Sequence, residues 1–231
     1  MHNDGNLLSV EPLNITGDSD LRNYIPYLLR GGKRLVDHSV RVAYLTRSLG
    51  QALGLEADTA SSIACAAFFH DIGMIAIEDS IVNKSEPLTA EDWGHLKEHT
   101  TLGARFLSYT ASEEASIAMD IALCHHEKFT GEGYPNGLAG KEIPLPARVV
   151  AVADQYDALR SKRPYKQALS HETTLLTLVF GDERTSPEHL DPEVLAAFLT
   201  AEGEIGKIWD EMSEATPPLG SNAFEATRLA S

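Results

Sequence analysis

The amino-acid sequence predicts an all-α fold, and two observations support this prediction. Apolar residues recur at helical spacing along most of the 231-residue chain, whereas few segments alternate in the manner of strands. Hydrophobic residues make up 43% of the sequence, which suits an ordinary folded core. No linker divides residues 30–200, so we expect one domain over residues 30–214, a lead segment at 1–29 and a tail at 215–231.

The first two helices of this domain should each turn one imidazole toward the interior. His38 shares a face with three aliphatic residues in a helix expected over about residues 33–53. The segment 58–71 repeats the arrangement and places His70 at its end, with Gly73 as a stop signal. Both histidines are therefore predicted to face the same interior.

The next helical region begins with the pattern of a capping box. Thr89 is followed three residues later by Asp92, a spacing that begins helices. We expect this helix to run toward Glu98, and a second short helix to contain Gly103. His99 is then placed at the junction between the two.

A further helical pattern leads from Ser112 to the adjacent pair His125 and His126. Glycines and prolines follow the pair and break any regular element, which predicts a long shaped loop. The two rings can spread apart because helical geometry ends at this point, and both could then reach one metal ion.

The C-terminal half of the domain is also predicted to be helical. Pro146 suits the first turn of a helix that places Asp154 and Asp157 along one side. Later helices are expected around residues 173–180 and after a capping Asp191.

Charge and composition restrict the classes of function. The formal net charge of −15 argues against a protein that wraps duplex nucleic acid or lies on an anionic membrane, because both need an extensive basic face. Residues 1–20 lack the features of a signal peptide, and no run of 18 apolar residues is present, so we expect a cytoplasmic protein. Cys65 and Cys124 lie in apolar helical patterns, and buried free thiols are expected rather than a disulfide.

One basic run stands out in this acidic chain. It reads RSKRPYK and occupies residues 160–166. It is either a solvated turn or a local binding site for an anionic ligand.

The histidines are concentrated, because six of the nine lie between positions 38 and 126 (His38, His70, His95, His99, His125 and His126). A lone inward histidine is more often a core residue with one hydrogen bond than a ligand, but several that converge can be satisfied by a divalent cation. Asp71 adds a carboxylate beside His70, and Asp154 lies on an otherwise apolar face where it would need a counter-charge. The pattern therefore favours a buried metal centre.

Taken in order, the chain contains His38, the dipeptide His70-Asp71, His99, the motif HHExxxGxGYPxGLxGxxIPLxAR from His125, the motif VAxADxxDAL, and RPYK at 163–166. Over about residues 30–200 this series resembles the HD-GYP subgroup of the HD phosphohydrolase superfamily. The resemblance implies a five-helix HD core with additional C-terminal helices. It also implies a metal centre of iron or manganese and hydrolysis of cyclic di-GMP through pGpG, often to GMP.

The same resemblance assigns roles to individual residues. The implied metal ligands are His38, His70, Asp71, His99, His125, His126 and Asp154. Asp71 would bridge two ions, and Asp71 and Asp154 would form part of the catalytic centre at which a metal-activated water attacks the phosphodiester. Tyr134 is implied to lie near the substrate, while Arg163 and Lys166 match residues that hold a substrate phosphate.

Several positions depart from the family pattern or stay open. Arg34 occupies the position where trinuclear members carry glutamate, so we predict two metal ions. Met74 replaces a family lysine near the scissile phosphate, and reduced activity is expected. His95 is either a ligand or a supporting core residue. Arg41 completes an HxxR spacing with His38, and a solvent-facing arginine is the alternative.

Three functions therefore follow from the sequence. The first is a cyclic di-GMP phosphodiesterase, the second is a phosphodiesterase for another cyclic dinucleotide such as cyclic GMP-AMP, and the third is a weakly active or inactive signalling or binding module. Zinc or nickel are alternatives to iron or manganese, because the same nitrogen and oxygen ligands accept them. Signalling proteins are candidate partners, and the sequence does not set the oligomeric state.

Overall fold

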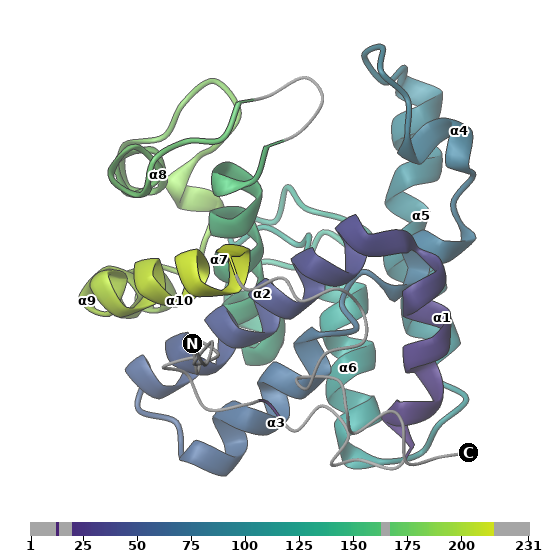
Figure 1. Ribbon diagram of the computed structural model, residues 1–231, viewed down its shortest axis with the longest axis horizontal. Coiled ribbons are helices and arrows are strands. Elements are labelled where there is room, and N and C mark those ends of the chain that lie inside the picture. The colour runs from purple at the N-terminus through teal and green to yellow at the C-terminus, as the bar shows by residue number, and fades with distance from the viewer. Residues whose placement is uncertain (1–12, 14–19, 163–166, 215–231) are drawn as a thin grey trace, which may run out of the picture.

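The computed structural model describes residues 13, 20–162 and 167–214, and these residues form helices without any strand (Figure 1). The all-α prediction is confirmed. The α-helices are α1 (Ile25–Arg30), α2 (Gly32–Ala52), α3 (Ala57–Ala67), α4 (Asp79–Val82), α5 (Ala90–Leu107), α6 (Glu113–Cys124), α7 (Leu145–Arg160), α8 (His171–Phe180), α9 (Pro192–Thr200) and α10 (Glu202–Glu214). The 3-10 helices are η1 (Leu21–Tyr24), η2 (Ile72–Ala76), η3 (Gly140–Glu142) and η4 (Pro187–His189).

The long helix α2 is the central element of the domain. It packs against α3, α7 and α10, as Figure 1 shows, and α5 and α6 form a neighbouring pair. The predicted inward face of α2 is fully buried at Val42, Leu45 and Leu49. Burying a leucine side chain contributes about 1.5–3 kcal/mol, so this face anchors the helix whose next inward residue is His38.

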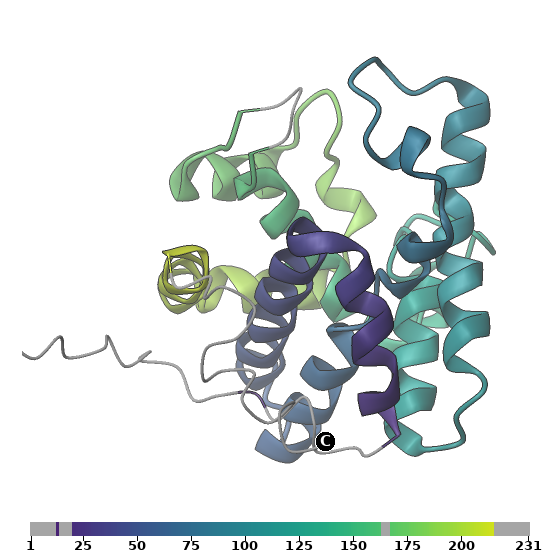
Figure 2. The same ribbon diagram turned by 45° about the vertical axis from the view of Figure 1, so that its right-hand side comes forward.

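Residues just before position 30 belong to the same core. Leu21, Ile25 and Leu28 are buried in it, although the sequence analysis assigned residues 1–29 to a lead segment. Figure 2 shows α1 lying alongside α2. The tail expected at residues 215–231 lies outside the described residues.

The helix expected over residues 58–71 ends earlier than predicted. α3 stops at Ala67, and His70 lies in the turn that leads to η2. Gly73 does not end a helix but lies inside η2. Its role is a close approach, because a Cβ atom at this position would meet the backbone oxygen of His99 at 2.0 Å and the backbone nitrogen of Gly103 at 2.6 Å.

The two short helices expected around His99 are one helix. α5 runs without a break from Ala90 to Leu107, and the capping box of Thr89 and Asp92 is confirmed at its start. A glycine inside a helix costs only about 1 kcal/mol, so Gly103 does not interrupt it. The small residue instead lets η2 pack against α5.

The remaining local signals are confirmed. Ser112 caps α6, and Asp191 caps α9. Pro146 lies in the first turn of α7. Both cysteines carry free thiols, with Cys124 buried and Cys65 half-buried, and burial raises the pKa of each thiol to about 11.

One segment is long and apolar enough to cross a membrane by length and composition, which the sequence analysis did not expect. It covers Ala57–Ala76 and contains both α3 and η2. Core helices pass the same test, and here Ile63, Phe68 and Ile72 are buried among the other helices.

Candidate metal centre

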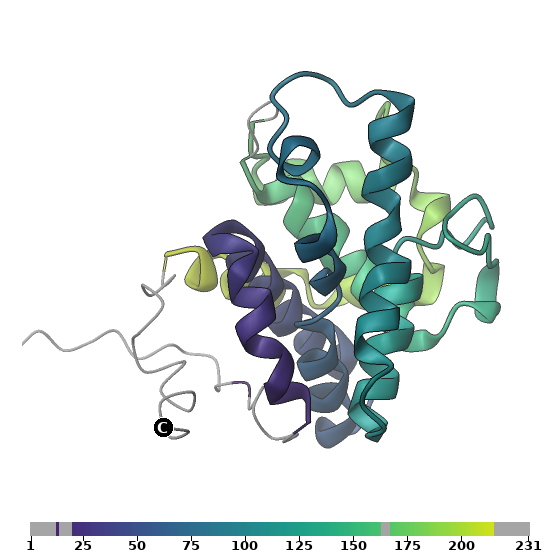
Figure 3. The ribbon, with the colours of Figure 1, turned by 90° about the vertical axis from the view of Figure 1, so that its right-hand side faces the viewer.

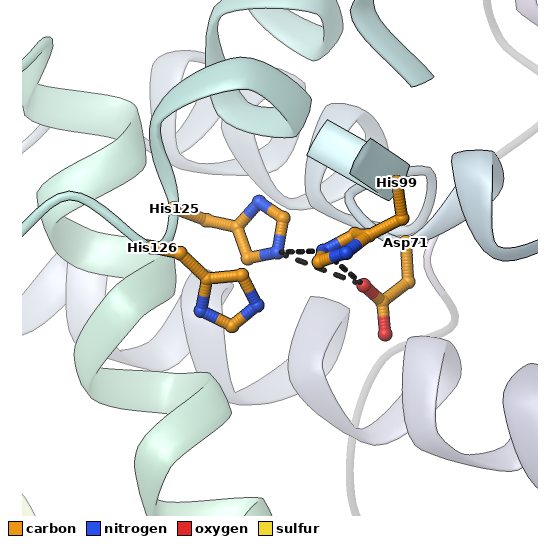
Figure 4. A group of neighbouring side chains, drawn as sticks. All are labelled: Asp71, His99, His125 and His126. Carbon is orange, nitrogen blue, oxygen red and sulfur yellow. Dashed lines mark hydrogen bonds and ion pairs between the residues drawn. The ribbon is translucent and has the colours of Figure 1, made fainter. Parts of the chain in front are cut away.

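Seven histidine and aspartate side chains from five segments of the chain come together in two neighbouring groups. Group A consists of His38, His70 and Asp154, and group B consists of Asp71, His99, His125 and His126. Within each group, every residue offers one ligand atom, and these atoms lie within 4.8 Å of one another. Figure 4 shows group B, whose side chains point toward a common centre.

The elements that supply these side chains are far apart in sequence. His38 lies on α2 and Asp154 on α7, while His70 and Asp71 occupy the turn after α3. His99 lies in the middle of α5. His125 is the C-cap of α6 and is followed by His126, where the helical geometry ends as expected.

Asp71 lies between the two groups and faces both. Its Oδ2 atom is 3.7 Å from Nε2 of His38 and 3.6 Å from Nε2 of His70. Its Oδ1 atom is 3.4 Å from Nε2 of His99 and 3.6 Å from Nε2 of His125. One carboxylate therefore presents one oxygen to each group, which is the arrangement of a ligand shared by two cations.

Hydrogen bonds at Nδ1 determine which nitrogen of each ring faces the centre. His70 donates its Nδ1–H to the carbonyl of Ala67 at 2.9 Å, and His99 donates to that of Leu96 at 2.6 Å. His125 donates in the same way to backbone carbonyls of α6. A carbonyl only accepts hydrogen bonds, so Nδ1 carries the proton and Nε2 of the neutral ring holds the free lone pair.

The Nε2 atoms are close together. Those of His38 and His70 are 3.1 Å apart, and those of His99 and His125 are 3.4 Å apart. When both rings of a pair are neutral, each presents a lone pair to the other, and the two imidazoles do not stabilise one another. A cation between them would satisfy both, because neutral imidazole nitrogens are preferred ligands of divalent metals.

The protonation equilibria of the cluster agree with this reading. Burial would raise the pKa of Asp71, but the neighbouring His70, His125 and His99 hold it well below its usual value. Burial would likewise raise the pKa of Asp154, but its hydrogen bond with His38 lowers it. Both carboxylates therefore stay ionised.

The imidazoles of the cluster differ in their pKa values. Burial lowers the pKa of His70 to about 4 and holds that of His126 well below its usual value. For His38, burial is outweighed by hydrogen bonds with Asp154 and Asp157, which raise its pKa to about 10. The ionised carboxylates and the uncharged imidazoles of His70 and His126 fit divalent cations, whereas His38 would release a proton when it binds one.

Asp157 and Arg41 form an outer layer around His38. Asp157 is fully buried, and His38 donates its Nδ1–H to Asp157 Oδ2 at 2.7 Å. Arg41 does not face solvent, because its Nε donates to Asp157 Oδ1 at 2.5 Å and its side chain is largely buried. The alternative of a solvent-facing Arg41 is therefore wrong, since a carboxylate 116 residues away in sequence provides its partner.

The loop after His126 is held by residues that the sequence analysis did not assign. Glu127 is buried and accepts hydrogen bonds from the backbone amides of Asn136 at 2.7 Å and Leu138 at 3.1 Å. Gly133 permits this closure, because a Cβ atom there would lie 2.3 Å from the backbone nitrogen of Lys128. The sequence signal for Glu127 was its place in the motif that begins at His125.

This loop places Tyr134 against the cluster. Its ring centroid lies 4.9 Å from that of His126, and the ammonium group of Lys97 lies 5.0 Å from the same tyrosine ring. Burial raises the pKa of the Tyr134 hydroxyl above its usual value, so the group stays protonated and can donate a hydrogen bond.

His95 is not part of the cluster. Its side chain is 54% exposed and pairs with Glu98 at 3.7 Å, so neither a ligand role nor a core role is correct. His95 does share a face of α5 with His99, but the N-terminal half of α5 extends beyond the end of α6 (Figure 3). The periodicity of one helix could not reveal where its neighbour ends.

The basic run at residues 160–166 is only partly described. Arg163 and Lys166 lie outside the described residues. Arg160 is buried, donates to the hydroxyl of Tyr156 at 2.8 Å and pairs with Asp210 at 2.8 Å, so it is not a solvated turn residue.

A cleft of about 610 Å³ opens beside the cluster. Its lining includes His38 and Asp71 as well as Met74, which contributes no charge. The basic residues on its wall are Arg30, Lys33, Arg34, Arg41 and Lys162. A protein with a net charge of −15 thus gathers basic side chains around one opening that reaches His38 and Asp71.

Comparison with known protein families agrees with this geometry. A family model described as "HD domain" matches residues 26–194. The chain belongs to the HD-domain family. The resemblance to the HD-GYP subgroup is confirmed by relatives of this HD domain.

Three relatives illustrate the range of named activities. The HD-domain chain is 38% identical over 191 residues to a cyclic di-GMP phosphodiesterase of Thermotoga maritima, covering 82% of this chain and 51% of the relative. It is 37% identical to the cyclic di-GMP phosphodiesterase response regulator RpfG of Xanthomonas campestris, with 76% and 46% covered. It is 35% identical to 3'3'-cGAMP-specific phosphodiesterase 2 of Vibrio cholerae, with 75% and 31% covered. The chain therefore spans about half or less of the length of these relatives.

Two solved structures share the fold. The protein Bd1817 of Bdellovibrio bacteriovorus, described as an HDG"Y"P protein, aligns with a TM-score of 0.54 at 20% identity, covering 76% of this chain and 51% of that one. The HD domain of the L. monocytogenes phosphodiesterase PgpH, in complex with cyclic-di-AMP, aligns with a TM-score of 0.53 at 15% identity, covering 86% and 100%.

Proposed function

We propose that this HD-domain protein is a metal-dependent phosphodiesterase that hydrolyses cyclic di-GMP to pGpG, with GMP as a further product. The observation that carries the proposal is the position of Asp71, which presents one carboxylate oxygen to each of two ligand groups. Relatives named cyclic di-GMP phosphodiesterases support the choice of substrate.

Group A and group B would each hold one divalent cation, with Asp71 common to both. Two cations so placed supply Lewis acidity toward a phosphodiester and lower the pKa of water. Iron or manganese are the proposed metals, and the nitrogen and oxygen ligands also accept zinc or nickel. Arg34 supports a count of two, because its exposed guanidinium group lines the same cleft and would repel a third cation.

The chain's own residues would bind and orient the substrate. A cyclic dinucleotide carries two phosphates, and the cleft offers Arg30, Lys33, Arg34 and Lys162 to them. Tyr134, whose ring packs against that of His126, can donate a hydrogen bond. Fixing the phosphodiester in this way lowers the barrier, because orientation can contribute several kcal/mol.

The relatives also give a reason to test the alternative substrate. Relatives named 3'3'-cGAMP-specific phosphodiesterases match this chain at 33–35% identity, close to the identity of the cyclic di-GMP enzymes. The two substrates differ in the base of the second nucleotide, and the proposed chemistry at the metals is the same for both.

Met74 motivates the third reading of a weakly active binding module. The side chain lies on the wall of the cleft beside Asp71, where a lysine would add a charge. Deleting one charge-stabilising donor at an active site commonly costs about 2.7–4 kcal/mol of transition-state stabilisation. Met74→Lys is therefore expected to raise turnover by tenfold or more if the present chain is slow.

The test is a hydrolysis assay on protein loaded anaerobically with Mn²⁺ or Fe²⁺. Cyclic di-GMP and 3'3'-cGAMP are supplied in parallel, and the products are separated by chromatography. Appearance of pGpG or GMP that is abolished in Asp71→Asn supports the proposal. Tight binding of the dinucleotide without any product, in the wild type and in Met74→Lys alike, would instead make the protein a binding module.

A further inference from the structure

Asp157, the buried carboxylate behind His38, receives hydrogen bonds from several directions. Its Oδ2 atom accepts from Nδ1 of His38 at 2.7 Å, and also from Arg41 at 3.1 Å and Ser161 at 3.2 Å. Its Oδ1 atom accepts from Arg41 at 2.5 Å and from the indole Nε1–H of Trp209 at 2.7 Å. The indole hydrogen bond is the only one of these that comes from α10.

Trp209 is itself held firmly in place. The guanidinium group of Arg160 lies 4.1 Å from the centroid of its ring, and that of Arg41 lies 5.8 Å away. Arg160 is fixed in turn by the hydroxyl of Tyr156 and the carboxylate of Asp210. The indole is thus half-buried near two guanidinium groups, in an orientation that points its N–H at Asp157.

The helix that carries this tryptophan lies beyond the matched family region. The family model covers residues 26–194, whereas α10 spans Glu202–Glu214 and packs against α2 and α9. The contact from α10 to the cluster therefore comes from outside the region that the family model matches.

We propose that Trp209 is a positioning residue for group A, acting through Asp157 on the orientation of His38. The inference rests on the metal centre of the proposed function, but it concerns the affinity for the metal and not hydrolysis. A histidine ligand is commonly oriented by a carboxylate on its second nitrogen, and loss of such outer partners costs about 10- to 100-fold in metal affinity.

The physical reason lies in the bonding capacity of Asp157. The indole N–H and the Arg41 Nε–H share Oδ1, so together they fix the plane of the carboxylate and leave Oδ2 aimed at His38. Without the indole N–H, the buried carboxylate keeps its charge but loses one of the donors that define its rotation. The imidazole of His38 then has a less defined direction toward His70 and Asp154.

The experiment uses Trp209→Phe, which keeps an aromatic ring for the cations but removes the N–H donor. Zn²⁺ affinity is measured by chelator competition in the full chain with His126→Ala, which weakens group B and leaves group A to dominate. Trp93→Phe is the matched control, because Trp93 is 49% exposed on α5. Thermal unfolding of each variant checks that the fold is kept.

We expect Trp209→Phe to lower Zn²⁺ affinity at group A by about tenfold, the lower end of the outer-partner range, because Arg41 and Ser161 remain. In an Asp157→Asn background the same substitution should change the affinity less than twofold, since Trp209 acts through that carboxylate. The Trp93→Phe protein retains one indole, that of Trp209, and the NMR resonance of its N–H should shift when Zn²⁺ is added.

Two results would overturn the proposal. One is an unchanged Zn²⁺ affinity in Trp209→Phe, and the other is an equal loss in the Asp157→Asn background. If Trp209 had only a structural role, Trp209→Phe would lower the Zn²⁺ affinity of group B as much as that of group A. The affinity of group B is measured in a His38→Ala background. Zinc binding that follows the expected pattern in a protein without hydrolytic activity would sustain this inference and remove the proposed function.

Discussion

Gly73→Ala is predicted to damage the metal centre without altering any proposed ligand. The added Cβ atom would lie 2.0 Å from the backbone oxygen of His99, whereas ordinary contacts begin near 3.4 Å. Backbone atoms cannot rotate aside, so η2 and α5 must separate by at least about 1 Å to bring this contact to 3.0 Å. Gly73 is two residues from Asp71, and the atom that it meets belongs to His99, so the same displacement widens the 3.4 Å separation between Asp71 Oδ1 and His99 Nε2.

Metal–ligand distances tolerate deviations of only about 0.2 Å, so a shift of this size should remove tight binding at group B. Overpacking of this kind costs about 1–3 kcal/mol, which corresponds to a fall in Tm of roughly 2–12 °C for a domain of this length. The assays are differential scanning calorimetry and Zn²⁺ competition in a His38→Ala background, which leaves group B to dominate.

Gly94→Ala is the matched control, because Gly94 lies in the same α5 and a Cβ atom there meets nothing within 4 Å. It should stabilise the protein by about 0.5–1 kcal/mol through helix propensity and leave the metal affinity unchanged. A Gly73→Ala protein with wild-type Tm and wild-type Zn²⁺ affinity would show that the close approach of η2 and α5 does not set the position of Asp71.

Three further predictions concern other parts of the site. Asp71→Asn should lower retained metal at both groups, as measured by elemental analysis after gel filtration, and loss at only one group would contradict its shared position. Because the pKa of His38 is raised to about 10, a metal that binds this residue below pH 10 must displace its proton. Calorimetry at pH 8 in buffers of different ionisation enthalpy should therefore detect proton release. The metal affinity of group A should rise by up to about tenfold for each unit of increase in pH below 10. Glu127→Ala removes the acceptor of two part-buried loop amides, which should lower kcat and destabilise the fold by about 1 kcal/mol while metal content stays normal. Unchanged kcat would show that the loop does not depend on this carboxylate.

The sequence predicted most clearly those features that depend on neighbours in the chain. The caps at Thr89, Ser112 and Asp191 follow from hydrogen bonds within three residues, and all three are present. The helical period of α2 likewise placed His38 on the same side as the buried aliphatic residues. The convergence of the seven histidines and aspartates was predicted from residue type and family resemblance together.

The features that were missed depend on contacts between distant segments. Gly103 suggested a break between helices, whereas it serves the close packing of η2 against α5. Arg41 finds its partner 116 residues away, and no helical period reports such a pairing. Asp157 was placed on the correct side of its helix, but its link to Trp209 could not be inferred because α10 carries no motif that points to it.

The five segments that supply the clustered side chains have a consequence for the lifetime of the chain. An ion bound at their meeting point would act as a multi-way cross-link, since it ties α2, the turn after α3, α5, the end of α6 and α7 to one another. A ligand present at 100 times its dissociation constant adds about 2.7 kcal/mol to the free energy of unfolding. Loss of the metal would then make the protein more susceptible to proteolysis and would remove the proposed activity at the same time.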